Sequence, residues 1–157
     1  MTVRSSWNYY TYATPEYFAT HGTPKTPQDL KHHNCVIHQI NLYEGDKWTF
    51  THKSNLVTIP INGNLKINNS AIALESALSG VGLVRLPRYF FQQHIDRGEL
   101  VEVLGNYTAP KLTAWLIVPR NEYLSRKHEV FIDFLVNAYQ KAGAKTAQNW
   151  AVSQKRR

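Results

Sequence analysis

Hydrophobic positions along the chain follow two different periods. Residues 47–52 and 55–59 alternate between apolar and polar side chains, which predicts two antiparallel strands. Residues 125–141 instead carry a single polar stripe at i, i+4 spacing and are apolar elsewhere, which predicts a long helix with a wide apolar face. Residues 112–118 are almost all apolar and predict a central strand that is buried on both faces.

Two Thr-Pro pairs mark the starts of short helices. Thr14 is expected to cap a helix that begins at Pro15 and stops at Gly22, because a threonine hydroxyl accepts a first-turn N–H and proline fits the first helical position. Thr26-Pro27 predicts a second start by the same argument. The other expected elements are strands over 8–13, 35–39, 65–68, 83–86 and 99–104, and helices over 70–79 and 88–97.

The alternation of strands with helices predicts an α/β architecture with a largely parallel sheet. Residues 106–110 are expected to form a linker ahead of the strand over 112–118. The helix over 70–79 should face the core with four apolar side chains, which are those of Ile72, Leu74, Ala77 and Leu78.

The composition agrees with a folded domain, and most of the net positive charge lies in the C-terminal segment of the chain. The chain of 157 residues is 43% hydrophobic and 18% charged, which is typical of a protein that buries its own core. Of the formal charge of +7, residues 141–157 supply +5, so residues 1–140 are nearly neutral. We expect only weak, salt-sensitive and non-specific binding to DNA through that tail.

Metal sites, disulfides and membrane spans are not predicted. Cys35 is the single cysteine, which excludes a disulfide framework and a paired-cysteine zinc motif. Cys35 lies near His32, His33 and His38, but a strand over 35–39 points Cys35 and His38 to opposite faces, so we expect structural roles and no metal. A signal peptide is not recognisable in the first residues, and no apolar run reaches membrane-spanning length, so a cytoplasmic protein is expected.

Catalytic motifs are also not recognisable. Gly80-Val81-Gly82 lacks the third glycine and the preceding strand of a dinucleotide loop, so we expect neither an enzyme nor a bound cofactor.

Asn68-Asn69-Ser70 is a candidate anion-binding site, because a strand leads directly into a helix N-terminus, which attracts anions. On the sequence alone, ordinary capping of that helix by Asn69 or Ser70 is the favoured explanation of these residues, because every helix needs a cap.

A series of motifs in the chain resembles the LysR-type transcriptional regulators. The match covers about residues 12–138 in the family's order, and the combination is specific. The matching pieces are Thr14–Phe18, His21-Gly22, Pro24, Pro27 with Asp29-Leu30, His33–Cys35, Trp48 with Phe50, Asn68–Ser70, Ala77–Leu83, Leu86-Pro87, Gly98–Val101 with Val103-Leu104, Pro119-Arg120 and Phe131–Leu135.

The resemblance implies a fold like that of type II periplasmic binding proteins, in which two α/β lobes hold a small effector and the chain crosses between the lobes twice. It implies that 1–13 is a first-lobe or hinge strand and that 14–107 is the complete second effector-binding lobe. It also implies that 108–141 returns through the hinge to a first-lobe strand and C-terminal helix, ahead of a basic tail over 142–157. The DNA-binding helix-turn-helix and most of the first lobe are expected to be missing.

The function implied is effector sensing in transcription regulation. The cleft of this fold faces the strand ends of the second lobe, so the expected effector-binding residues are Gln39, Asn41, Asn69 and Ser70, with a small anionic organic molecule as the ligand. Apolar surface on 112–118 and on 125–141 predicts a homo-oligomer. The alternative is a stand-alone module for ligand binding or oligomerisation that does not act on DNA.

Overall fold

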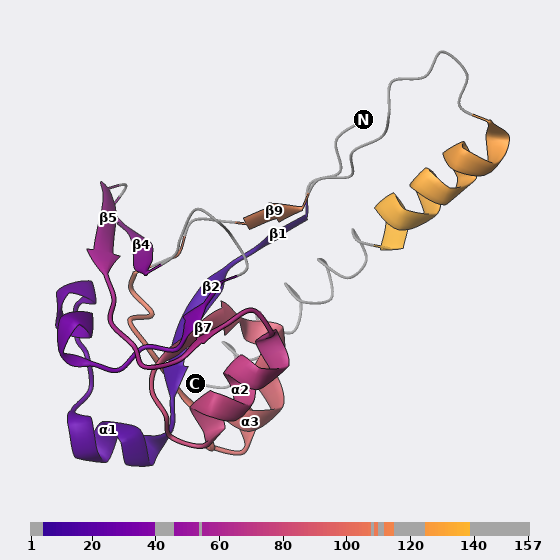
Figure 1. Ribbon diagram of the computed structural model, residues 1–157. Coiled ribbons are helices and arrows are strands. Elements are labelled where there is room, and N and C mark those ends of the chain that lie inside the picture. Colours follow the sequence, from indigo (N-terminus) through magenta and orange to yellow (C-terminus); the bar gives the residue numbers. More distant parts are fainter. Residues whose placement is uncertain are drawn as a thin grey trace. The chain divides into compact units, whose positions relative to one another are not determined.

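A computed structural model of the chain describes residues 5–39, 46–53, 55–107, 109, 112–114 and 125–138. The chain divides into two compact units, of which residues 8–110 form the larger and residues 1–7 with 111–157 form the other. The larger unit contains a sheet with helices and a hairpin around it (Figure 1).

The sheet of the larger unit is built from short strands. β2 (Tyr9–Ala13) lies between β7 (Val84–Pro87) and β8 (Val101–Val103) and runs antiparallel to both. β3 (Ile37–His38) pairs in parallel with β6 (Lys66–Ile67). These strands carry the ends at which the candidate site is found.

Backbone hydrogen bonds join the two groups of strands. Cys35 forms a parallel bridge with Leu83, and the N–H of Val36 donates to the carbonyl of Leu83 at 2.8 Å. The strand order is therefore β6-β3-β7-β2-β8. The prediction of a largely parallel sheet is right for β6, β3 and β7 and wrong for β2, because a hydrophobic pattern does not report which strand becomes a neighbour.

Helices and a hairpin cover the sheet. The hairpin strands run antiparallel as predicted, with Trp48 opposite Ile59. Thr14 caps the first helix, also as predicted: its hydroxyl accepts from the N–H of Tyr17 at 3.2 Å, and Gly22 ends the helix at φ 80°. The elements are α1 (Pro15–His21), the 3-10 helix η1 (Pro27–His32), β4 (Lys47–His52), β5 (Asn55–Pro60), α2 (Ser70–Leu78), the 3-10 helix η2 (Arg88–Phe90) and α3 (Gln92–Asp96).

The core lies on both faces of the sheet. β2 sends Tyr12 into the cluster beneath α2 and sends Ala13 into the cluster that contains the aromatic residues of α1 and the hairpin. The inward face predicted for α2 is partly wrong, because Ala73, Ser76 and Ala77 are its buried residues while Ile72 is 52% exposed. This short helix carries apolar side chains on most of its sides, so the periodicity of the sequence alone does not show which face packs against the sheet.

The helix predicted over 88–97 is also interrupted. Residues 88–90 form the 3-10 helix η2 and α3 begins only at Gln92. Phe91, between them, is fully buried, and its ring lies 4.4 Å from that of Tyr12. The interruption at Phe91 therefore coincides with the burial of its ring in the core.

The smaller unit contains a strand pair and a helix. β1 (Ser5–Trp7) pairs antiparallel with β9 (Leu112–Ala114), with Ser6 opposite Thr113. A helix over 126–138 agrees with the prediction over 125–141, of which residues 139–141 lie outside the described residues. Residues 115–118 of the predicted central strand lie outside them as well.

A histidine buried beside α1 makes stability depend on pH. The Nδ1 of His33 is 3.3 Å from the Tyr17 hydroxyl, and that hydroxyl also accepts from the N–H of Asn34 at 3.0 Å. Burial lowers the pKa of His33 below its usual 6.5, and the charge of His21 adds to this. The unfolded chain therefore binds the proton first, so stability is complete above about pH 6.5 and is lost as the pH falls through lower values.

We expect the urea midpoint of the chain to fall between pH 7 and pH 5, and to fall less in His33→Gln. The matched control is His32→Gln, since the His32 side chain is exposed. A midpoint equally dependent on pH in His33→Gln and in the unchanged chain would contradict this assignment.

Candidate functional site

The carboxyl ends of three strands meet at one edge of the sheet. β3 ends at His38, β6 at Ile67 and β7 at Pro87. These strands run in the same direction, so their carboxyl ends share an edge, and α2 begins at Ser70 directly beyond β6. Ligands of open α/β sheets bind outside the carboxyl ends of the strands, which makes this edge the candidate site.

Asn69 and Ser70 lie at this edge, as their place in the sequence predicts. The Asn69 side-chain oxygen accepts from the N–H groups of Ala71 and Ile72 at 2.9 and 3.2 Å. Asn69 is thus the N-cap of α2, which is the ordinary role expected as the alternative. No acidic side chain lies in the first turn of α2, so the positive end of its dipole is not neutralised within the helix.

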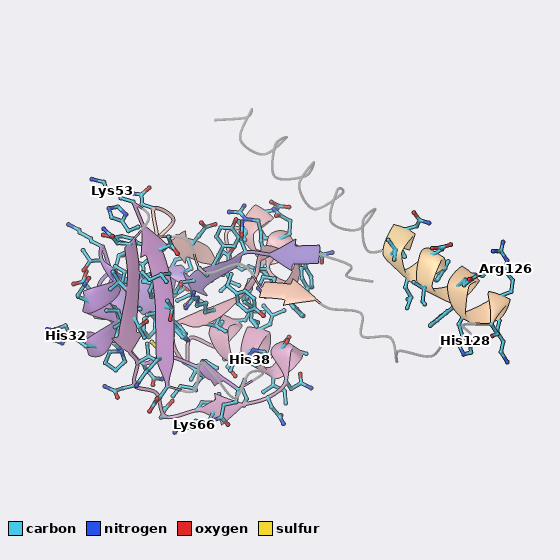
Figure 2. The ribbon with its side chains drawn as sticks, turned by 90° about the horizontal axis from the view of Figure 1, so that it is seen from above. His32, His38, Lys53, Lys66, Arg126 and His128 are labelled. Atoms are coloured by element: carbon cyan, nitrogen blue, oxygen red, sulfur yellow. The ribbon has the colours of Figure 1, made fainter. Side chains whose placement is uncertain are left out.

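His38 is a residue of this edge that sequence reasoning did not place there. Its Nε2 lies 3.4 Å from the Ser70 hydroxyl, and burial lowers the pKa of His38. The side chain is half-buried and lies beside the α2 side of the sheet (Figure 2). Period-two alternation from the buried Val36 puts His38 on the same face as Val36, and this signal could have identified it.

The other two predicted contact residues are Gln39 and Asn41. Gln39 is exposed and directly follows β3. Its N–H donates to the carbonyl of Ile67 at 2.7 Å, so Gln39 lies beside the end of β6, shortly before α2 begins. Asn41 lies outside the described residues. The described residues of the predicted set therefore lie at the end of β3 and at the start of α2, with His38 beside them.

A second polar group lies at the end of β7 and was also not found from the sequence. Arg88 donates from Nη2 to Glu102 of β8, and both side chains are about one-fifth exposed, at 21% and 22%. The Arg88 guanidinium lies 5.2 Å from the centre of the Tyr10 ring. Arg88 directly follows Pro87, and its side chain reaches back over β2 to Glu102, so its place in the sequence does not reveal this pair.

Tyr12 completes what we call the Arg88–Glu102–Tyr12 cluster. It is the direct partner of Glu102 in the β2–β8 register and is fully buried. Burial raises the pKa of Tyr12, the Glu102 charge raises it further, and the Arg88 charge opposes this. A hydrogen bond between the side chains of Tyr12 and Glu102 also raises the pKa of Tyr12. Among the described residues, the buried Nε of Arg88 has no partner in hydrogen-bond geometry.

Metal ligands do not gather among the residues that the structure describes, where no group of three or more His, Cys, Asp or Glu side chains could hold an ion. His32 lies well away from His38 (Figure 2), so these two histidines do not share a site. Cys35 is fully buried, and burial raises the pKa of its thiol to about 12. In the same part of the chain, no helix is long and apolar enough to cross a membrane.

Solved structures share this fold. The full-length virulence activator AphB of Vibrio cholerae superposes with a TM-score of 0.73 at 18% identity, over 88% of this chain and 47% of that one. The regulatory domain of AphB from Vibrio vulnificus gives a TM-score of 0.72 at 23% identity, over 88% of this chain and 68% of that one. Such regulatory domains have the type II periplasmic-binding-protein fold that the resemblance implied.

Sequence comparison identifies the family. A Pseudomonas aeruginosa protein named as a transcriptional regulator is 33% identical over 124 residues, which cover 78% of this chain and 40% of that protein. The chain thus spans about 40% of the length of the curated relatives it matches. The LysR substrate binding domain family matches residues 5–140. The chain therefore belongs to the LysR substrate binding domain family.

Proposed function

We propose that the chain is the effector-sensing part of a LysR-type transcriptional regulator and that it binds a small anionic organic molecule at the edge formed by β3, β6 and α2. Gln39, Asn41, Asn69 and Ser70 are the proposed contacts, with His38 beside them. Residues 14–107 act as the second effector-binding lobe in this proposal, between the first-lobe segments 1–13 and 108–141.

One observation carries the proposal: the half-buried His38 meets Ser70 at the point where parallel strands end and α2 begins. The Ser70 hydroxyl is a donor for an anion, and the α2 dipole points its positive end the same way. A neutral imidazole can take up a proton when a carboxylate binds beside it, because a nearby negative charge raises a histidine pKa. The site is therefore suited to a carboxylate more than to a neutral ligand.

Asn69→Asp tests the site without removing the cap. Aspartate keeps an oxygen acceptor for Ala71 and Ile72, so α2 should remain capped, while a fixed negative charge should repel an anion. We expect succinate, citrate or benzoate to raise the melting temperature of the unchanged chain in a thermal-shift assay, and to lose this effect in Asn69→Asp.

The matched control for charge is Asn55→Asp, an equal change at an exposed position of the hairpin. It should leave the response to the carboxylates unchanged. If none of the three carboxylates shifts the melting temperature, or if Asn69→Asp responds as strongly as the unchanged chain, an anion site at this edge is refuted.

The relatives that match are regulators by name, and the remaining parts of the proposal follow from that likeness. We propose that the chain works in the cytoplasm, does not catalyse turnover, and does not bind a specific DNA sequence by itself. Sequence-specific retardation of a promoter fragment by this chain alone would contradict the last point.

A further inference from the structure

We propose that the site takes up a proton together with its carboxylate ligand, and that this proton makes His38 the hydrogen-bond donor to Ser70, so that the Ser70 hydroxyl donates to the ligand. A carboxylate is then bound more tightly in acidic than in neutral solution. The inference rests on the proposed function for the place and the chemistry of the ligand. It adds a direction to the contact between His38 and Ser70 and a pH dependence to binding.

Ser70 is the first residue of α2 and offers two donors to an anion. The side chain and the carbonyl of Asn69 accept from the N–H groups of residues 71–73. Among the bonds of the described residues, these use the N–H groups that follow Ser70 and leave its own N–H to an incoming ligand. The hydroxyl is the second donor, but only while its hydrogen is not directed to His38.

The contact between Ser70 and His38 allows either atom to be the donor. The Nε2 of His38 lies 3.4 Å from the Ser70 oxygen, and in a neutral imidazole this nitrogen either donates or accepts. When a proton from solvent is added to the ring, both ring nitrogens carry hydrogen, so His38 can only donate. The Ser70 oxygen then accepts from Nε2, and its own hydrogen turns to the carboxylate without leaving the serine.

His38 lacks a charged partner until a ligand supplies one. Burial alone lowers the pKa of His38 below its usual 6.5. The charged residues of the elements that contact β3 or His38 are Lys66 of β6, Arg85 of β7 and Glu75 of α2, and none of them shifts this pKa. A bound carboxylate raises the pKa of His38, because it stabilises the protonated ring.

Affinity for a carboxylate is expected to rise as the pH falls. Free His38 has the lower pKa and ligand-bound His38 the higher one, so binding takes up a proton when the pH lies between these two values. Within this interval the affinity increases by up to about tenfold for each pH unit. It becomes constant at lower pH, where free His38 is already protonated, and at higher pH, where the bound form is not.

Titration calorimetry with benzoate measures this proton directly. The heat of binding should differ between two cationic buffers of different ionisation enthalpy, because the buffer releases the proton that the site takes up. Benzoate suits the test because a carboxylic acid titrates at about pH 4, below the range used. Cationic buffers do not compete for an anion site. We expect the affinity to be roughly fivefold higher at pH 6 than at pH 7.5.

Variants of both residues assign the proton. His38→Gln should bind benzoate without proton uptake and with a flat pH profile, because an amide does not titrate in this range. Ser70→Ala should weaken binding at pH 6 about tenfold, and Ser70→Thr should bind more tightly than Ser70→Ala because it keeps a hydroxyl. His32→Gln is the control, since His32 is exposed and lies well away from His38 (Figure 2).

Equal heats in the two buffers for the unchanged chain overturn the inference, as does the same proton uptake in His38→Gln. Equal binding by Ser70→Ala and Ser70→Thr overturns the role of the Ser70 hydroxyl. Should His38→Gln not fold, the buffer comparison on the unchanged chain and the two Ser70 variants still decide. If benzoate binds without proton uptake and Asn69→Asp abolishes binding, the proposed function stands and this inference fails; no binding at any pH refutes both.

Discussion

Gly63→Ala is expected to prevent folding of the chain. A Cβ at residue 63 would lie 1.7 Å from the backbone oxygen of Cys35. Because that oxygen belongs to the backbone, it cannot rotate away as the end of a flexible side chain could. Cys35 is fully buried, and its N–H donates to the carbonyl of Asn62 at 2.8 Å, so moving the two segments apart would break that bond within the core.

Loss of the far-ultraviolet circular dichroism signal and of soluble protein would show this result. Gly82→Ala should behave in the same way, since its Cβ would lie 2.1 Å from the backbone oxygen of Asn34. Gly98→Ala is the control: it has φ +74° but no atom within 4 Å, so only backbone strain of about 1–2 kcal/mol is expected. A folded Gly63→Ala protein with a normal melting temperature would refute the close approach.

Phe131→Asp is expected to dissociate the chain into monomers. Val130, Phe131 and Phe134 on the helix over 126–138 are 53%, 59% and 65% exposed. Burying a large apolar side chain contributes roughly 1.5–3 kcal/mol, so these three residues provide a strong drive for association with a second copy. We therefore expect light scattering to report a dimer or a higher oligomer for the unchanged chain and a monomer for the variant.

Asn137→Asp is the matched control, because it adds the same charge to an exposed polar position of the same helix. It should leave the oligomer intact. A monomeric unchanged chain at high concentration would contradict the assembly prediction, as would a Phe131→Asp chain that remains associated. Trp115 and Tyr139, two further large apolar residues of the segments predicted to associate, lie outside the described residues.

Local signals predicted the short elements well. Thr14 and Pro15 started α1 and Gly22 ended it, because a cap hydroxyl, a fixed φ and a freely adopted positive φ act over a few neighbouring residues. Alternating side chains predicted the hairpin of β4 and β5 for a similar reason. Asn69 was found at the start of α2 because the end of a strand and a cap follow each other directly in the sequence.

Packing between distant segments was not predicted. Nothing near Ile72 in the sequence shows that Ala73, Ser76 and Ala77 would be the buried side of α2, or that Phe91 would interrupt the helix after β7. The Arg88–Glu102 pair joins the first residue of η2 to a residue of β8, with β2 between them in the sheet, and no spacing along the chain encodes this.

The amino-acid sequence alone was enough to predict the family, the positions of most strands and helices, and the strand–helix junction at Asn69 and Ser70. Element positions and this junction depend on neighbours within about one turn or one strand pair. Three features became visible only in the folded chain: the antiparallel direction of β2, the contact of His38 with Ser70, and the position of the buried Tyr12 opposite Glu102. These features depend on which strands become neighbours, and that is fixed by burial and hydrogen bonding between segments far apart in the chain.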